Sequence, residues 1–311
     1  MLQLLVTVLG LAALVLFFAW LARKAFRSRK PWLRWPGTIF SGLLAAIFLA
    51  VTLVSGLGVA RLYLPQDVPL TDFTVDYSPE SVARGEHLAQ VVCASCHSPD
   101  RLNPLPLAGG NRSLSVDAGL PLGTLIAPNL TPASRIAQWS DAEIARAIRQ
   151  RVDPQNRPVL MPAVALSYLS DEDLAALVAY LRSQPAVENE VPPLQPSLLT
   201  AMLAGAGLFN VSNPGIQAPV TAAGRAITAE YGKYIVDYLD CRTCHGPDLA
   251  GGEPPLVNGP NLTNIMNAWS EEEFTSFMRT GVDRVGRKID PNLMPWTEIG
   301  RLDDLEMQAL Y

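Results

Sequence analysis

Two long apolar stretches open the chain, at residues 2–22 and 38–60, and neither contains a charged residue. Each matches the roughly 20 residues that a helix needs to cross a bilayer. We therefore predict a hairpin of two transmembrane helices within residues 1–60, joined by the short segment 23–37. For the first stretch a cleaved signal peptide is the alternative, but no basic residue precedes it and its apolar part is too long.

Beyond residue 60 the pattern changes to short segments with apolar residues at helical spacing, and the order of these segments repeats once. Capping signals mark the helix starts at Ser78 and Thr228, and Ser-x-x-Glu boxes follow at Ser140 and Ser270. The pattern predicts an all-α protein in which the hairpin is followed by two tandem domains. The predicted ranges are 61–77 for a tether, 78–183 for the first domain, 184–227 for a Pro-rich linker and 228–311 for the second domain.

A C-x-x-C-H motif stands near the start of each predicted domain, and the two motifs use all four cysteines of the chain. This spacing is typical of c-type haem attachment, in which both thiols form thioethers and the adjacent imidazole binds the iron. A zinc or redox C-x-x-C is the alternative, but no further cysteines and only three histidines are available to complete a zinc site. We predict two covalently attached haem c groups, held by Cys93, Cys96 and His97 and by Cys241, Cys244 and His245.

Each domain has the same order of features: a helix, C-x-x-C-H, a Pro-Asn-Leu turn, a Leu-Met-Pro loop and a final helix. This order resembles class I cytochrome c. The resemblance implies that the carbonyls of Pro128 and Pro260 accept hydrogen bonds from the two haem histidines, which would orient the imidazole rings. It also implies that a Met is the sixth iron ligand, so the predicted metal ligands are His97, Met161, His245 and Met294.

Several assignments keep an alternative at this stage. Either predicted Met ligand could be a core residue, and Met266, Met278 and Met307 are rivals at the second haem; Met294 is preferred because it repeats the Leu-Met-Pro context. In the loops before these Met residues, Arg157 and Arg287 either bind haem propionates or are exposed. His87 is interpreted as a surface or interface residue.

Two departures from the resemblance have structural consequences. The first domain carries an additional segment near residues 102–123, of a kind that often shapes a docking face. In addition, Tyr311 aligns with Tyr180, in the middle of the first domain's final helix, so we expect the native chain to continue beyond residue 311.

The charge is unevenly distributed, although the net charge is only −5. The first 60 residues contain no acidic residue and six basic ones, all between the apolar stretches: Arg23, Lys24, Arg27, Arg29, Lys30 and Arg34. The remainder is acidic, which argues against a nucleic-acid partner. The positive-inside rule places the basic segment in the cytoplasm, and therefore both domains on the other side. The class of protein implies haem attachment on that periplasmic side, so we expect the bacterial inner membrane.

A haem iron with His and Met ligands has no open position for a substrate, which indicates an electron carrier rather than an enzyme. We predict a membrane-anchored dihaem cytochrome c that relays single electrons within or out of a respiratory or photosynthetic complex. Similar layouts occur in cytochrome subunits of cbb-type oxidases, membrane-bound dehydrogenases and quinol-oxidising complexes. Its expected partners are integral membrane subunits and a periplasmic redox protein. The alternative is a dihaem redox enzyme of the peroxidase or thiosulfate-oxidising type, which requires one exchangeable haem ligand.

Overall fold

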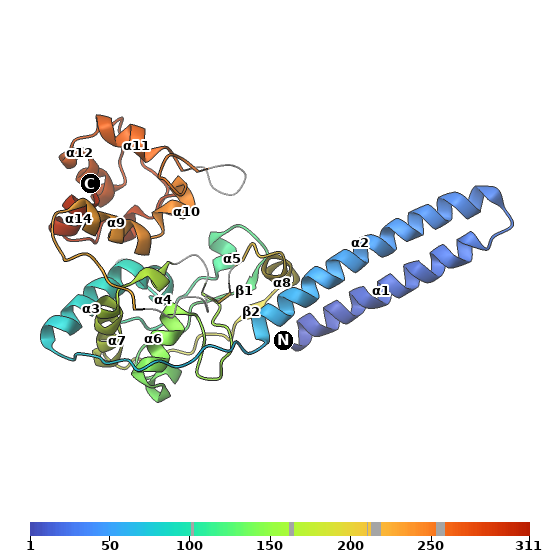
Figure 1. Ribbon diagram of the computed structural model, residues 1–311, viewed down its shortest axis with the longest axis horizontal. Helices are drawn as coiled ribbons and strands as arrows, with labels where there is room; N and C mark the ends of the chain where they lie inside the picture. Colours follow the sequence, from blue (N-terminus) through green and yellow to red (C-terminus); the bar gives the residue numbers. More distant parts are fainter. Residues whose placement is uncertain (101–102, 162–164, 210, 213–218, 253–258) are drawn as a thin grey trace.

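The computed structural model describes residues 1–100, 103–161, 165–209, 211–212, 219–252 and 259–311, and it is mostly helical, as predicted (Figure 1). Helices α1 (Leu2–Phe26) and α2 (Pro31–Tyr63) form a long hairpin that projects from the rest of the chain. Both are long and apolar enough to cross a membrane. Both helices extend into residues 23–37, which were predicted as a loop. Arg and Lys are tolerated on a helix near the membrane interface, because only the ends of their side chains need water.

The first helical unit is built around a crossing of α3 (Pro79–Val92) with α7 (Asp171–Ser183). Ser78 caps α3, and Ser140 and Glu143 form the predicted capping box of α6 (Asp141–Arg149). The remaining elements of this unit are short. They are α4 (Ala94–His97), α5 (Leu114–Asp117), β1 (Gly123–Thr124) and the 3-10 turns η1 (Arg135–Gln138) and η2 (Leu166–Tyr168).

The segment between the two units is partly ordered by the first unit and by the hairpin. Strand β2 (Gln195–Pro196) pairs antiparallel with β1, and these are the only strands in the described residues. Helix α8 (Leu198–Gly205) follows directly and packs along α2. Figure 1 shows α8 at the base of the hairpin.

The second unit repeats the first on a smaller scale. Helix α9 (Ala229–Tyr238) packs against α14 (Asp304–Leu310), as α3 packs against α7. The predicted capping box of Ser270 and Glu273 opens α12 (Glu271–Thr280). The short elements are α10 (Cys241–His245), α11 (Leu262–Ile265), η3 (Met266–Ala268) and α13 (Trp296–Ile299).

Candidate haem sites

In the first unit, helices α3 and α4 place the C-x-x-C-H motif at the wall of the core. The imidazole of His97 is 8% exposed, and its Nδ1 lies 2.8 Å from the carbonyl oxygen of Pro128. Burial lowers the pKa of His97, and the bond to Pro128 opposes this only in part. The ring is therefore neutral, donates through Nδ1 and keeps the lone pair of Nε2 for a metal.

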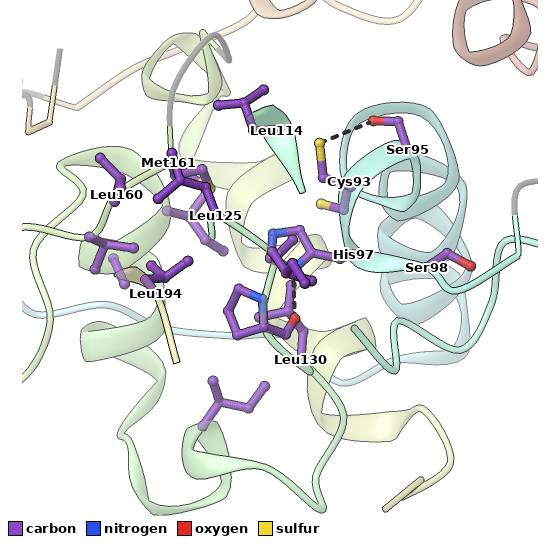
Figure 2. A pocket seen from close by; sticks show the side chains of 18 of the residues that line it. Cys93, Ser95, His97, Ser98, Leu114, Leu125, Leu130, Leu160, Met161 and Leu194 are labelled. Atoms are coloured by element: carbon purple, nitrogen blue, oxygen red, sulfur yellow. Dashed lines mark hydrogen bonds between the residues drawn. The ribbon is translucent and has the colours of Figure 1, made fainter. Parts of the chain in front are cut away.

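A deep apolar pocket opens beside this imidazole. Figure 2 shows Cys93 and His97 on one side of it and Leu160 and Met161 on the other. Its other lining residues include Leu125, Leu130, Ile136, Trp139, Ile144 and Leu181. Two thiols, a neutral imidazole and a thioether around an apolar space are the donor set of a covalently bound haem with His and Met ligands. The residues present therefore fit haem c. Burial also raises the pKa of the Cys93 thiol to about 12.

The loop that carries Met161 is organised by the carboxylate of Asp153. Its Oδ1 accepts the backbone N–H groups of Gln155 and Arg157 at 2.9 and 2.8 Å, and its Oδ2 lies 3.1 Å from Nε of Arg157. Arg157, which was expected either to bind a haem propionate or to be exposed, pairs with this aspartate, and its Nη2 also donates to Gln155. The sequence analysis did not identify Asp153. The signal was an Asp four residues before the Arg in both repeats.

Helices α9 and α10 place the second motif in the same way. His245 is 5% exposed, and its Nδ1 lies 2.9 Å from the carbonyl oxygen of Pro260. Burial raises the pKa of the Cys241 thiol to about 12. The structure therefore brings both predicted His–Pro pairs together with their cysteines.

The loop before Met294 repeats the arrangement of the first unit. Asp283 accepts the backbone N–H of Arg287 at 2.8 Å and its Nε at 2.9 Å. Met294 is partly buried against the hydrophobic core. Two rival ligands, Met278 and Met307, are core residues that are 8% and 0% exposed, and Met266 is partly buried beside them.

A repeated Ala-Gly-Gly segment after each motif was also missed. The amide N–H groups of Gly109 and Gly251 donate to the carbonyls of His97 and His245 at 2.8 and 2.9 Å. Both glycines have a positive φ, at 99° and 112°, which explains the residue type. The Ala-Gly-Gly segment of the first unit therefore corresponds to that of the second. The additional residues of the first unit fall into two parts, one before Ala108 and one after Gly110.

Comparison with known proteins gives two separate matches. Residues 80–181 match the family described as cytochrome c oxidase, cbb3-type, subunit III, and residues 229–311 match the family described as cytochrome c. Both units are cytochrome c domains.

The relatives are subunits of dehydrogenases. A nicotinate dehydrogenase subunit of Pseudomonas putida is 31% identical over 302 residues, which cover 86% of this chain and 24% of the relative. The fructose dehydrogenase cytochrome subunit of Gluconobacter japonicus is 27% identical, over 68% of this chain and 47% of its own length. The gluconate 2-dehydrogenase cytochrome c subunit of Pantoea cypripedii is 28% identical, over 64% and 51%. The chain thus spans between about a quarter and a half of these relatives.

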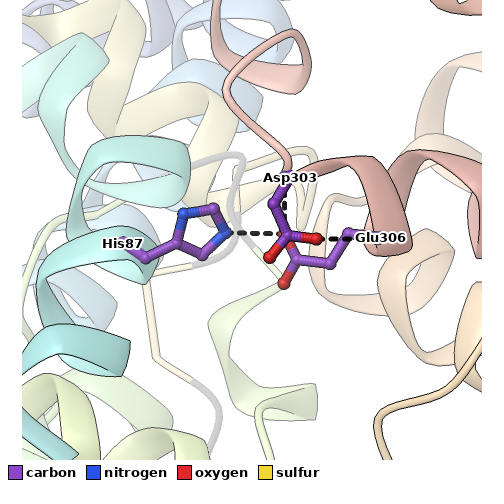
Figure 3. A group of neighbouring side chains, drawn as sticks. All are labelled: His87, Asp303 and Glu306. Atoms are coloured by element: carbon purple, nitrogen blue, oxygen red, sulfur yellow. Dashed lines mark hydrogen bonds and ion pairs between the residues drawn. The ribbon is translucent and has the colours of Figure 1, made fainter. Parts of the chain in front are cut away.

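The two cytochrome c domains contact each other through a buried charged cluster. Glu306 of α14 is fully buried, and its carboxylate lies 2.6 Å from Nε2 of His87 on α3 (Figure 3). The same carboxylate lies 2.5 Å from Nη1 of Arg84, also on α3. Tyr234 of α9 adds a hydrogen bond of 2.7 Å to Asp173 of α7. His87 is therefore an interface residue, as expected.

Proposed function

We propose that this chain is a membrane-anchored cytochrome c with two covalently bound haem groups, and that it relays single electrons from a substrate-oxidising dehydrogenase subunit to a further acceptor. The observation that carries the proposal is the repeated site: each C-x-x-C-H motif has its histidine buried and bonded through Nδ1 to a proline carbonyl. The relatives, which are named as cytochrome subunits of dehydrogenases, support the same role.

The residues of each site supply what an electron carrier needs. When bound, the haem provides a one-electron couple at its iron. His97 and His245 would be the proximal ligands, fixed in orientation by Pro128 and Pro260. Met161 and Met294 would fill the sixth positions, which leaves no place for a substrate and raises the reduction potential relative to two histidines. The dehydrogenase relatives do not favour the alternative of a peroxidase or thiosulfate-oxidising enzyme.

We further propose that α1 and α2 anchor the chain in the bacterial inner membrane, with the cytochrome c domains on the periplasmic side. The basic residues cluster where the hairpin turns, at its end farthest from both domains (Figure 1). A short basic segment between two spans stays on the cytoplasmic side. Integral membrane subunits and a periplasmic redox protein are the partners that this placement permits.

Purification from native membranes in mild detergent tests the proposal. We expect a dehydrogenase subunit to co-purify. We also expect the substrate of that subunit to reduce the haem iron of the complex, as followed by the haem absorption bands. The chain separated from this subunit should not be reduced by the same substrate. If the separated chain instead consumes hydrogen peroxide or thiosulfate by itself, the relay function is wrong and the chain is an enzyme.

A further inference from the structure

Helix α8 is apolar except for Thr200, and the side of it that faces away from α2 is only partly covered by protein. No Asp, Glu, Lys, Arg or His occurs between Glu190 and Arg225, in an otherwise acidic chain. Its small residues face α2 and are buried: Ala201, Ala204 and Gly205. Its large residues Leu199, Met202 and Leu203 remain partly exposed, and Leu208 just beyond it is 64% exposed. A helix at a water surface would carry polar side chains on that outer face.

The contact between α8 and α2 has the character of helix packing inside a membrane. A Cβ at Gly58 would lie 1.6 Å from the carbonyl oxygen of Ala201, and one at Gly205 would lie 1.9 Å from that of Val54. Ala201 and Gly205 are four residues apart on one helix. Small residues at this spacing let two backbones approach closely, which is how helices associate in lipid, where apolar burial gives no driving force.

The contact also sets the depth of α8. Val54 and Gly58 belong to the apolar stretch 38–60 of α2. At a rise of about 1.5 Å per residue, Val54 lies roughly 9 Å from the end of that stretch at Ala60. Because Ala201 lies at Gly58 and Gly205 lies at Val54, α8 follows α2 over this depth, and its C-terminal end is the deeper one.

The carbonyl groups at the C-terminal end of α8 have protein hydrogen-bond partners. Nη1 of Arg61 donates to the carbonyls of Ala204 and Gly205 at 2.6 and 3.1 Å, and the backbone N–H of Leu208 donates to Leu203. At the other end Ser197 caps the helix. Backbone groups in a lipid environment need such internal partners, because hydrocarbon offers none. The positive charge of Arg61 also suits a helix C-terminus.

Helix α8 is tied to the first cytochrome c domain near its haem pocket. Oγ1 of Thr200 donates to the carbonyl of Leu122 at 2.6 Å, within the additional segment of that domain. Leu160, next to the predicted iron ligand Met161, packs against the cluster that includes Leu62 of α2 and Ala201 of α8. The cluster that α2 and α8 form together is therefore in contact with the Met side of the first haem site.

We propose that α8 lies in the lipid–water interface beside α2, with Leu199, Met202 and Leu203 in lipid, and that it holds the Met161 side of the first domain against the membrane surface. The proposal rests on the proposed insertion of α1 and α2. It commits to lipid as the covering material, because the small-residue contact continues directly from a membrane span.

Nitroxide spin labels in the full haem-loaded chain, reconstituted in phosphatidylcholine nanodiscs, test the proposal. The labelled variants are Met202→Cys and Leu208→Cys, with Leu53→Cys as the reference within α2 and Val285→Cys, 84% exposed in the second domain, as the aqueous reference. Oxygen partitions into lipid and a nickel chelate stays in water. We expect the ratio of oxygen to chelate accessibility at positions 202 and 208 to exceed that at 285 by roughly tenfold, because a polar chelate is excluded from apolar surroundings.

Each other outcome has a distinct meaning. If positions 202 and 208 resemble position 285, α8 is in water and the proposal is wrong. If neither reagent reaches them, a protein subunit covers the face and the proposal is also wrong. If position 53 is aqueous as well, the membrane insertion itself fails.

A second pair of variants tests whether α2 holds α8. Gly58→Leu should lower the ratio of oxygen to chelate accessibility at position 202 and leave the ratio at position 53 unchanged, because a side chain at Gly58 meets the backbone of Ala201. Gly56→Leu is the matched control, since a Cβ at Gly56 meets nothing within 4 Å. Equal behaviour of the two variants would refute the docking contact.

Discussion

At the residue scale, one glycine fixes the distance between the two main helices of the first cytochrome c domain. A Cβ at Gly85 of α3 would lie 1.9 Å from the carbonyl oxygen of Ala176 and 2.8 Å from Cβ of Tyr180, both on α7. We expect Gly85→Ala to lower the free energy of unfolding by about 3 kcal/mol, because neither backbone can move without disturbing the core. Thermal unfolding followed by circular dichroism measures the loss. Gly224→Ala, where a Cβ meets nothing within 4 Å, should change stability by less than about 0.5 kcal/mol.

A second residue, Asp153, is expected to act on the iron through the loop that it organises. Asp153→Ala removes the acceptor for the backbone N–H groups of Gln155 and Arg157, so the loop before Met161 should loosen. We expect the first haem to lose part of its Met ligation and its reduction potential to fall, with the second haem unchanged. Redox titration of the two haems measures this. Asp283→Ala should instead lower the reduction potential of the second haem and leave the first unchanged. Equal effects of both variants on both haems would contradict the local role of each aspartate.

At the element scale, helices whose signals lie in adjacent residues could be predicted, whereas contacts between distant elements could not. The capping boxes at Ser140 and Ser270 depend on residues three positions apart, and both form. The pairing of α3 with α14 depends on His87 and Glu306, 219 residues apart, and no periodicity connects them. The strand pair β1 and β2 was also missed, because strands of only two residues are too short to show an alternating pattern in the sequence.

The contact between α3 and α14 should make stability depend on pH. Burial alone would raise the pKa of Glu306, but the hydrogen bonds and charges of His87 and Arg84 outweigh burial and lower the pKa from 4.5 to about 2. Because the folded state has the lower pKa, the stabilisation is complete above about pH 4.5 and is lost as the pH falls toward 2. Guanidinium unfolding between pH 6 and pH 2 measures this dependence.

The variant Glu306→Gln should remove that part of the pH dependence. It should also cost roughly 2 kcal/mol at neutral pH, because the charged hydrogen bonds of Glu306 to Arg84 and His87 are weakened, although Arg84 keeps its ion pair with Asp173. Glu272→Gln, at an exposed position of α12, is the control and should keep the wild-type profile. An unchanged profile in Glu306→Gln would show that the cluster does not couple to unfolding.

At the scale of the whole molecule, the chain joins a hairpin of two helices that are long and apolar enough to cross a membrane to two cytochrome c domains. The two C-x-x-C-H motifs and the apolar stretches are local signals, so the sequence predicted this plan. The packing of α8 on α2 was not predicted, because its contact surface on α2 consists of small residues that are unremarkable in an apolar stretch. The iron ligands Met161 and Met294 stay predictions that rest on the repeated Leu-Met-Pro context and on their place beside each core.

Magnetic circular dichroism in the visible and near-infrared tests the central claim, an electron relay through two His/Met haems, most directly. The samples are the oxidised wild-type protein and the variants Met161→Ala and Met294→Ala. We predict two Met-to-iron charge-transfer contributions in the wild type and the loss of one in each variant. A wild-type haem that lacks this signature, or that readily binds cyanide or peroxide, would contradict the relay and indicate an open catalytic iron.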